Sequence, residues 1–400
     1  MSPAPPILEP RSGSRLAGVD WLRGLAMALM LIDHTRDFLH AESFWHRATD
    51  LSVISSATFL TRWITHFCAP VFLFLAGLSV HLMLQGGRDP RAVRRFLWTR
   101  GLWLVFCEFT LVTLGAEFQW EPWRHTLLAQ VIWVLGVSMI LMALLVRLPW
   151  GWILGLGLAL VFGHNLLDPI QAGAGPWAAV WTVLHQVGPV TPFGTPFPRI
   201  YFLYPVIPWP GVMALGFALG RCYQLEPARR RRLLARLGGA GILLFVLIRA
   251  WGGYGDPAPW SAQTNGFRTL LSFVNTTKYP PSLLYLLMTL SPALLLLAWR
   301  EGRAANPLDR ALSTLGRVPM FFYLLQWPVA HGMGVLFHAL AGKPWRAVLH
   351  LHRPFPAELG FRLWAVYLAW ALGLALLFPL CKAYAGLKQR HRDGWWWSYL

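Results

Sequence analysis

Residues 58–84 read TFLTRWITHFCAPVFLFLAGLSVHLML, and this stretch decides the fold. It contains one Arg and no Asp, Glu or Lys. A helix of about 20 mostly apolar residues crosses the hydrocarbon core of a bilayer, so the stretch predicts a membrane-spanning helix. Similar apolar runs lie at residues 17–39, 96–118, 126–146, 150–167, 200–220, 237–251, 281–298, 318–340 and 361–380.

Together these runs predict about ten spans. The fold class that we expect is all-α, a polytopic transmembrane helix bundle, because a helix satisfies its own backbone hydrogen bonds within lipid. A shorter apolar segment at 176–188 is bracketed by Gly and Pro, and we expect a surface or re-entrant helix there. Gly216/Gly220 and Gly151/Gly155 have the small-residue spacing that is typical of helix-packing contacts.

The composition agrees with a membrane protein. Only 13% of the 400 residues are charged, against about a quarter in soluble domains. The net charge of +18 comes from short Arg and Lys clusters between apolar runs, which argues against a nucleic-acid partner and for membrane lipids. Such clusters mark cytoplasmic loops, so both termini are expected to be cytoplasmic. The four cysteines lie within or beside apolar runs without metal-ligand spacing, so no metal site is predicted.

The chain divides into three predicted parts. Residues 1–14 form a disordered tail, residues 15–385 form one transmembrane domain, and residues 386–400 form a cytoplasmic C-terminal tail. The Arg-rich, Ala- and Gly-rich composition suggests a bacterial origin, so we expect the bacterial cytoplasmic (inner) membrane. The sequence leaves open whether the chain forms a homo-oligomer.

Ionisable residues inside a span are costly and therefore informative. Asp20 and Arg23 lie three residues apart and share a helix face, where they can form an ion pair. At the other end of the same run, His34 is flanked by Asp33, Arg36 and Asp37. A histidine oriented by a carboxylate is a typical general base, although a satisfied polar helix end is an equally good interpretation.

Other polar positions lie in the same predicted outer half of the bundle. They are His66 and the segment Asn275–Ser282, in which Asn, Thr, Lys and Tyr precede tandem prolines. His331 and Gln326 lie within a later span, and a single buried His is more often structural than catalytic. Convergence of polar groups from distant stretches indicates a pocket that opens outward.

At this point the residues resemble a known superfamily. The stretch Arg15-Leu-Ala-Gly-Val-Asp20-Trp-Leu-Arg23-Gly, followed by His34, resembles the opening of the transmembrane acyltransferases. These include the acyltransferase family 3 enzymes and the heparan-alpha-glucosaminide N-acetyltransferase-like proteins. The run Pro70-Val-Phe-Leu-Phe-Leu-Ala-Gly77 is similar to their second-helix signature. The pieces Asn275–Ser282 and Phe321–Gln326 look most like uncharacterised bacterial members of the second branch.

The resemblance implies transfer of an acyl group, usually acetyl, from cytoplasmic acetyl-CoA or another acyl-CoA to a sugar or glycan on the far side. The acyl-CoA is then a co-substrate, and no bound cofactor is implied. His34, fourteen residues after Asp20, matches the essential His of family 3. Arg94, Arg95 and Arg100 match the basic segment near the donor.

The chain departs from the lysosomal branch at one point. That branch has its catalytic His in the loop before the second helix, where this chain has Ser56, and His66 follows ten residues later. Either His34 or His66 is therefore the expected base, with Asp33 or Asp37 orienting it. Residues expected to contact the acceptor are Arg36, Asn275, Thr277, Lys278, Tyr279, Gln326 and His331.

Two other functions fit the same outward pocket. The first is a transporter or permease for a small or lipid-linked solute. The absence of a visible internal repeat argues weakly against it. The second is a non-catalytic membrane protein that binds a glycan or a lipid. Solute flux without acyl-CoA would indicate the transporter, and acyl-CoA binding without turnover would indicate the binding protein.

Overall fold

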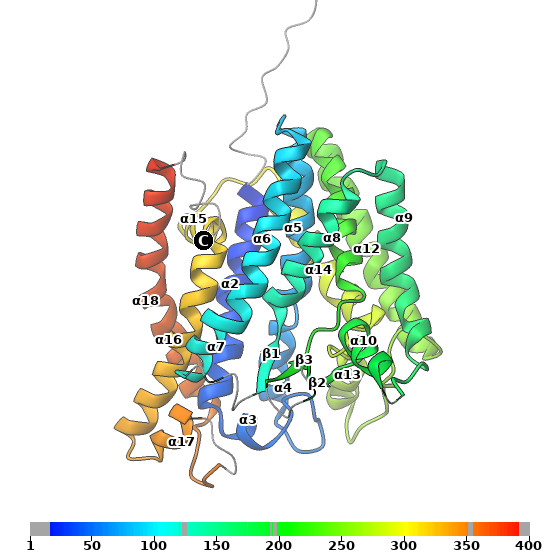
Figure 1. The fold of residues 1–400 in the computed structure, drawn as a ribbon. Helices are drawn as coiled ribbons and strands as arrows, with labels where there is room; N and C mark the ends of the chain where they lie inside the picture. The colour runs from blue at the N-terminus through cyan, green and yellow to red at the C-terminus, as the bar shows by residue number, and fades with distance from the viewer. Residues whose placement is uncertain are drawn as a thin grey trace, which may run out of the picture.

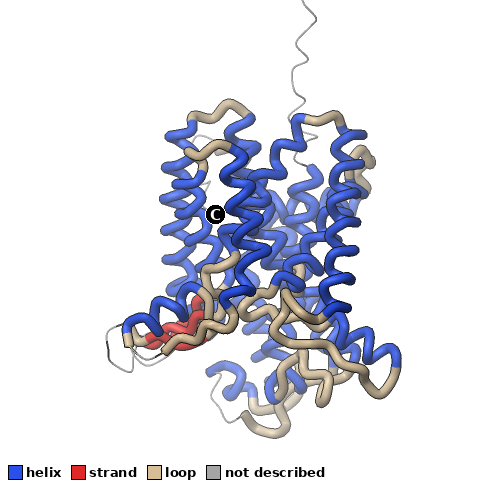
Figure 2. The backbone as a smooth tube through the Cα atoms, turned by 90° about the vertical axis from the view of Figure 1, so that its right-hand side faces the viewer, coloured by secondary structure: helices blue, strands red, loops and turns tan. Residues whose placement is uncertain are grey.

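The computed structural model describes residues 17–119, 121, 126–173, 175–192, 194, 198–350 and 355–391. The predicted tail 1–14 and residues 392–400 of the predicted C-terminal tail lie outside them. Figure 1 shows long helices side by side in a bundle, and Figure 2 shows that strands and long connections gather at one end of it.

Within the described residues, seven helices are long and apolar enough to cross a membrane. They are α4 with α5 (Ser56–Thr65, Cys68–Gln85), α6 with η1 and α7 (Pro90–Cys107, Glu108–Val112, Thr113–Glu117), α9 with η2 (Trp150–Gly163, His164–Leu167), α12 (Pro227–Trp251), α14 (Leu283–Arg300), α16 (Pro319–Leu340) and α18 (Leu363–Arg390). α2 (Ala17–Leu39), α8 (Val131–Leu145) and α11 (Trp209–Leu219), followed by η3 (Gly220–Gln224), lie among them. The predicted all-α polytopic bundle is confirmed, whereas the span count and the side of the termini stay predictions. α18 also continues through Arg390, five residues beyond the predicted domain end.

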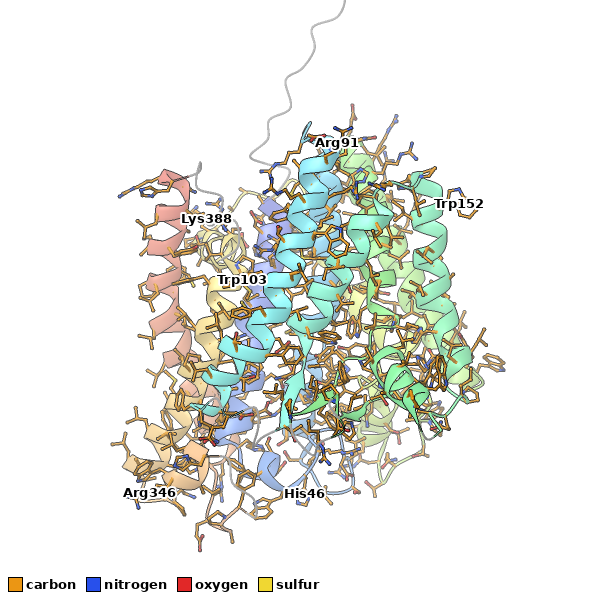
Figure 3. All side chains as sticks on the ribbon, in the orientation of Figure 1. His46, Arg91, Trp103, Trp152, Arg346 and Lys388 are labelled. Carbon is orange, nitrogen blue, oxygen red and sulfur yellow. The ribbon has the colours of Figure 1, made fainter. Side chains whose placement is uncertain are left out.

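The two ends of the bundle differ in structure. One end carries the strands β1 (Thr126–Ala129), β2 (Gly188–Val190) and β3 (Arg199–Phe202) and the short helices α3 (Ala41–Trp45), α10 (Pro176–Leu184), α13 (Gly266–Val274) and α17 (Trp345–His350). We call it the sheet end; His46 and Arg346 mark it in Figure 3. The opposite end carries α15 (Pro307–Arg317), and Arg91 and Lys388 mark it. We call it the basic end.

The sheet corrects two predicted spans, 126–146 and 200–220, which are wrong over their first residues. β1 pairs in parallel with β3, and β2 pairs with β3 in antiparallel orientation. Helix α8 begins only at Val131, and α11 only at Trp209. Short apolar runs do not distinguish a strand from a helix start, and the pairing satisfies backbone groups that the missing helical turns leave open. The predicted surface helix within 176–188 is confirmed as α10.

Glycines allow two central helices to touch. A Cβ on Gly216 of α11 would lie 1.9 Å from the Phe74 carbonyl oxygen, and one on Gly77 of α5 would lie 1.8 Å from that of Met213. The packing role predicted for Gly216/Gly220 is therefore confirmed. It is wrong for Gly151/Gly155 because no described atom outside their own helix lies within 4 Å of a Cβ placed there.

Candidate functional site

The sheet end contains a cavity with two lobes, which we call the sheet-end cavity. The lobes have volumes of about 500 Å³ and 550 Å³. They lie between α2, α4 and the segment 275–282, with the end of β3 alongside. Residues that line both lobes are Arg36, Arg47, Arg62, Leu203, Lys278 and Tyr279. The predicted outer polar residues are thus partly brought together.

Asp33 is the centre of an ion-pair network in this cavity. Its carboxylate pairs with the guanidinium groups of Arg36, at 2.9 Å, and Arg62, and it accepts a hydrogen bond of 3.1 Å from the Thr65 hydroxyl. Arg36 also donates to Asp37 at 2.7 Å. Because Arg62 comes from α4 and Arg36 from α2, the network ties these two helices together at the cavity wall.

Lys278 and Tyr279 enter the cavity from a braced loop. The Asp256 carboxylate accepts hydrogen bonds from the Thr277 backbone N–H (2.9 Å), the Thr277 hydroxyl (2.8 Å) and the Ser282 hydroxyl (2.7 Å). These bonds fix the chain on both sides of Lys278 and Tyr279. The Thr277 hydroxyl, predicted to contact an acceptor, therefore holds the loop.

Tyr279 is placed among cations. Arg62 donates a hydrogen bond of 3.2 Å to its hydroxyl, and the Lys278 ammonium lies 5.1 Å from its ring centroid. Burial opposes ionisation of the phenol, but the nearby positive charges of Lys278 and Arg62 outweigh burial and lower the pKa of Tyr279 below its ordinary value. Its O–H is thus a strong hydrogen-bond donor at the cavity wall.

His66 also lines the larger lobe. It follows the last residue of α4 and is only 1% exposed, and the Tyr285 hydroxyl donates to its carbonyl oxygen at 2.8 Å. Neither ring nitrogen has a hydrogen-bond partner among the described residues. A neutral imidazole beside a cavity, with no hydrogen bond on its unprotonated nitrogen, can accept a proton from a bound molecule.

His34 lies elsewhere. Its ring packs on Trp327 of α16, with ring centroids 3.7 Å apart. It is not among the residues that line the sheet-end cavity, whereas the preceding Asp33 is. Successive residues of an α-helix point about 100° apart, which is why Asp33 and Asp37 face the cavity and His34 faces the neighbouring helix.

The structure likewise places Gln326 and His331 away from both lobes. The His331 ring is stacked between Phe38 and Phe118, at centroid distances of 4.5 Å and 4.1 Å, and its Nε2 lies 3.0 Å from the Val348 carbonyl oxygen. Gln326 is fully buried, and its amide has no hydrogen-bond partner among the described residues. His331 is thus held by structural contacts with the surrounding helices.

The basic end contains a second cavity of about 280 Å³, which we call the basic-end cavity. Its four lining cations are Arg23, Arg100, Arg317 and Lys388. Arg23 is held by Asp20 at 2.9 Å, as predicted, and also donates to the Ser79 hydroxyl at 2.9 Å. The remaining lining is mostly apolar, so this cavity combines cations with an apolar interior.

Of the three arginines predicted to hold a donor, only Arg100 lines this cavity. Arg94 instead donates to the Ala143 carbonyl oxygen of α8 at 3.0 Å. Arg95 is exposed on α6. The three arginines of the basic segment therefore face different surroundings, because residues close together in the sequence of a helix point in different directions.

The two cavities meet at the start of α8. Val131 lines both of them. On α2, Met30 lines the sheet-end cavity and Met27 lines the basic-end cavity one turn away. The fully buried Glu108 lies beside this point and accepts a hydrogen bond of 2.8 Å from the Trp133 backbone N–H, which caps α8. The wall between the cavities is therefore only a few side chains thick.

Sequence reasoning missed several lining residues. In the basic-end cavity these are Arg23, Arg317 and Lys388. In the sheet-end cavity they are Arg47 and Arg62. A signal existed for Arg62, which lies four residues before His66 and so on the same helix face. Arg47 lies in a loop, where no periodicity indicates direction.

The sequence of this bundle matches a known protein family. The family model described as heparan-alpha-glucosaminide N-acetyltransferase, catalytic, matches residues 15–248, more than half of the chain. None of the curated proteins compared with the chain matches it. The matched region includes Asp33, Arg62, His66 and Arg100, and it ends before the loop of Lys278. The chain therefore belongs to the heparan-alpha-glucosaminide N-acetyltransferase family and is a multi-pass membrane protein of the acetyltransferase type.

Proposed function

We propose that this protein transfers an acyl group, acetyl in the first instance, from an acyl-CoA in the basic-end cavity to a sugar or glycan acceptor in the sheet-end cavity. The observation that carries the proposal is that Val131 lines both cavities. A thioester that enters from one end then comes close to an acceptor that enters from the other. Holding two reactants in contact lowers much of the barrier to a bimolecular reaction.

The basic-end cavity suits the donor. Arg100 and Arg317 line it, and the planar guanidinium group matches phosphate oxygens. Its apolar interior, with Met27, Phe72 and Met139 among the lining, suits the acyl-pantetheine arm. A volume of 280 Å³ admits that arm rather than a whole CoA, so the nucleotide part would remain at the basic rim.

His66 is the base in this proposal, because it lines the acceptor cavity and His34 does not. His66 takes the proton from the acceptor hydroxyl or amine, whose oxygen or nitrogen bonds to the thioester carbonyl carbon. The carbon–sulfur bond then breaks, and CoA leaves as a thiol with the proton that His66 held. Tyr279, whose hydroxyl lies at the cavity wall, would donate a hydrogen bond to the oxyanion. An acyl-His66 intermediate would use the same residues.

The charges suggest a direction across the membrane. Arg and Lys are more frequent on cytoplasmic loops. The cluster Arg229–Arg232 belongs to the start of α12, and Arg91 and Lys388 mark the basic end. We therefore place the basic end, with acyl-CoA, on the cytoplasmic side of a bacterial inner membrane. The acceptor then arrives from outside.

Release of CoA from acetyl-CoA by the purified protein, with a panel of amino sugars as acceptors, tests the proposal. His66→Ala should lower kcat by at least about 100-fold, the usual contribution of a general base. His34→Ala should keep activity close to wild type because its ring contacts Trp327 rather than the cavity. Full activity of His66→Ala would contradict the assignment of the base.

The four cysteines are all buried, so a thiol-reactive dye reports unfolding and identifies variants that fail to fold. Two cavities in line also suit a transporter, which the same preparation distinguishes. Solute flux in proteoliposomes without acyl-CoA, combined with no CoA release for any acceptor, would replace the acyltransferase proposal with the transporter.

A further inference from the structure

The sheet-end cavity has more positive than negative charge. Its formally charged lining residues are Arg36, Arg47, Arg62, Lys278, Asp33 and Asp37. Four cations face two carboxylates, which leaves two positive charges in excess. A neutral sugar does not need such an excess, so the excess itself calls for an explanation.

The ion pairs identify which cations are left over. Asp33 engages Arg36 and Arg62, and Asp37 engages Arg36. Neither Lys278 nor Arg47 forms an ion pair with a carboxylate of any described residue, and Lys278 is only 8% exposed. Burying an ammonium group without an anion is costly, so an anion that is not part of the chain is the natural partner of Lys278.

Lys278 is held in position before any ligand arrives. The Asp256 carboxylate binds the Thr277 N–H and hydroxyl just before it and the Ser282 hydroxyl after it. Asp256 itself lies 3.9 Å from Arg249, so its charge is balanced away from the cavity. The loop therefore presents one fixed positive charge to the cavity.

The loop of Arg47 is also fastened to its surroundings. The Asn275 side-chain amide donates to the Thr49 carbonyl oxygen at 2.9 Å, and the Arg268 guanidinium donates to the Leu51 carbonyl oxygen at 2.9 Å. Asn275, predicted to contact an acceptor, thus also positions the chain near Arg47. Arg47 lines both lobes together with Lys278, so the two cations face the same space.

We propose that the acceptor carries an anionic group, a phosphate or a carboxylate, which binds between Lys278 and Arg47. This inference rests on the proposed function and specifies its substrate class. The anion fixes the sugar in the larger lobe of about 550 Å³, which His66 also lines. The nucleophile of the acceptor then lies on the His66 side, and the anionic substituent lies at the mouth.

Binding of three matched probes to the purified protein tests the inference without acyl-CoA. The probes are glucose, glucose 6-phosphate and glucuronate, which share one ring and differ in charge and in the type of anion. We expect at least one anionic probe to bind about tenfold or more tighter than glucose, since hydrogen bonds between charged groups are the strong ones. Comparison of the phosphate with the carboxylate shows which anion the cavity prefers.

Variants locate the preference. Lys278→Met, which keeps the length and removes the charge, should reduce it about tenfold, and Lys278→Arg should keep part of it. Arg47→Gln tests the same preference at the second cation. The Arg47 side chain is exposed, so its substitution should not impair folding. Lys382→Met on the exposed face of α18 is the matched control and should bind all three probes as the wild type does.

Equal binding of glucose and both anions, or an unchanged preference in both Lys278→Met and Arg47→Gln, would overturn the inference. The proposed function fails separately. CoA release onto neutral acceptors with no charge preference leaves the acyltransferase proposal standing and removes this inference. A clear charge preference without CoA release for any acceptor leaves the anion site standing and removes the acyltransferase proposal.

Discussion

Helix α2 carries the pattern Asp-x-x-Arg at both of its ends, and the two copies have different surroundings. Near the basic end, Asp20 pairs with Arg23 at 2.9 Å, and Arg23 also donates to the Ser79 hydroxyl. Near the sheet end, Asp33 pairs with Arg36 and with Arg62 of a second helix. The first carboxylate serves one cation and the second serves two.

The difference teaches that a pattern in one helix does not define its role. The Asp20 side chain is 20% exposed and its partner keeps other acceptors, so the pair fastens the helix. The Asp33 side chain is 13% exposed and lies among cations that line a cavity. The same Asp-x-x-Arg spacing holds one lining arginine, Arg23, at the basic-end cavity, and it forms the centre of a charge network at the sheet-end cavity.

The largest effect that separates the two copies is expected from removal of one charge in each. Asp33→Asn leaves the buried Arg62 guanidinium without a carboxylate and leaves Arg36 with Asp37 alone. Loss of one partner of a buried pair costs about 3–5 kcal/mol. Asp20→Asn should cost about 1 kcal/mol or less, as partly exposed pairs do. Thermal unfolding followed with a thiol-reactive dye compares the two variants directly.

Asp33→Asn should also abolish CoA release in the protein that stays folded, because Arg62 and Tyr279 lose their fixed position. Asp20→Asn is the matched control and should retain most activity. Equal destabilisation by the two substitutions would show that the two ends of α2 do not differ in the way their contacts indicate.

A second comparison concerns the point where the two cavities meet. Val131→Trp should fill the junction and lower CoA release by about 100-fold, equivalent to about 2.7 kcal/mol of barrier. The two cavities should still bind their separate ligands, since Val131 is the shared residue and the cations lie further away. Val131→Ala is the control and should leave transfer nearly unchanged. Normal turnover by Val131→Trp would mean that the acyl group travels by another route.

Much of this fold could be predicted from the sequence. The apolar runs predict helices because lipid admits few other structures, and the run of residues 58–84 indeed forms α4 and α5. The starts of the runs at 126 and 200 could not be predicted. Thr126–Ala129 and Arg199–Phe202 pair over a long sequence separation, and no local pattern announces such a partner.

The sequence could predict at which end of the bundle the candidate site lies, but not which side chains face the cavity. His34 and Asp33 are neighbours in sequence, yet only Asp33 lines the cavity, because a polar helix end gives no apolar stripe from which to read the buried face. His66 and Lys278 were identified because polar residues are conspicuous beside apolar runs. Arg47 was not, since its position depends on hydrogen bonds between two loops.

The smallest expected effect tests the basic end, with two arginines of one helix. Arg100 of α6 lines the basic-end cavity, whereas Arg95 is exposed on the same helix. Arg100→Ala should raise KM for acetyl-CoA about tenfold with a smaller change in kcat, since one charge-assisted hydrogen bond contributes about 1.5–3 kcal/mol. Arg95→Ala should leave KM unchanged. Because both substitutions remove the same charge from the same end, a general loss of attraction for the CoA phosphates would affect the two equally. Only a donor seated in the cavity predicts that they differ, and an equal rise in KM would therefore move the donor out of the cavity and onto the surface of α6.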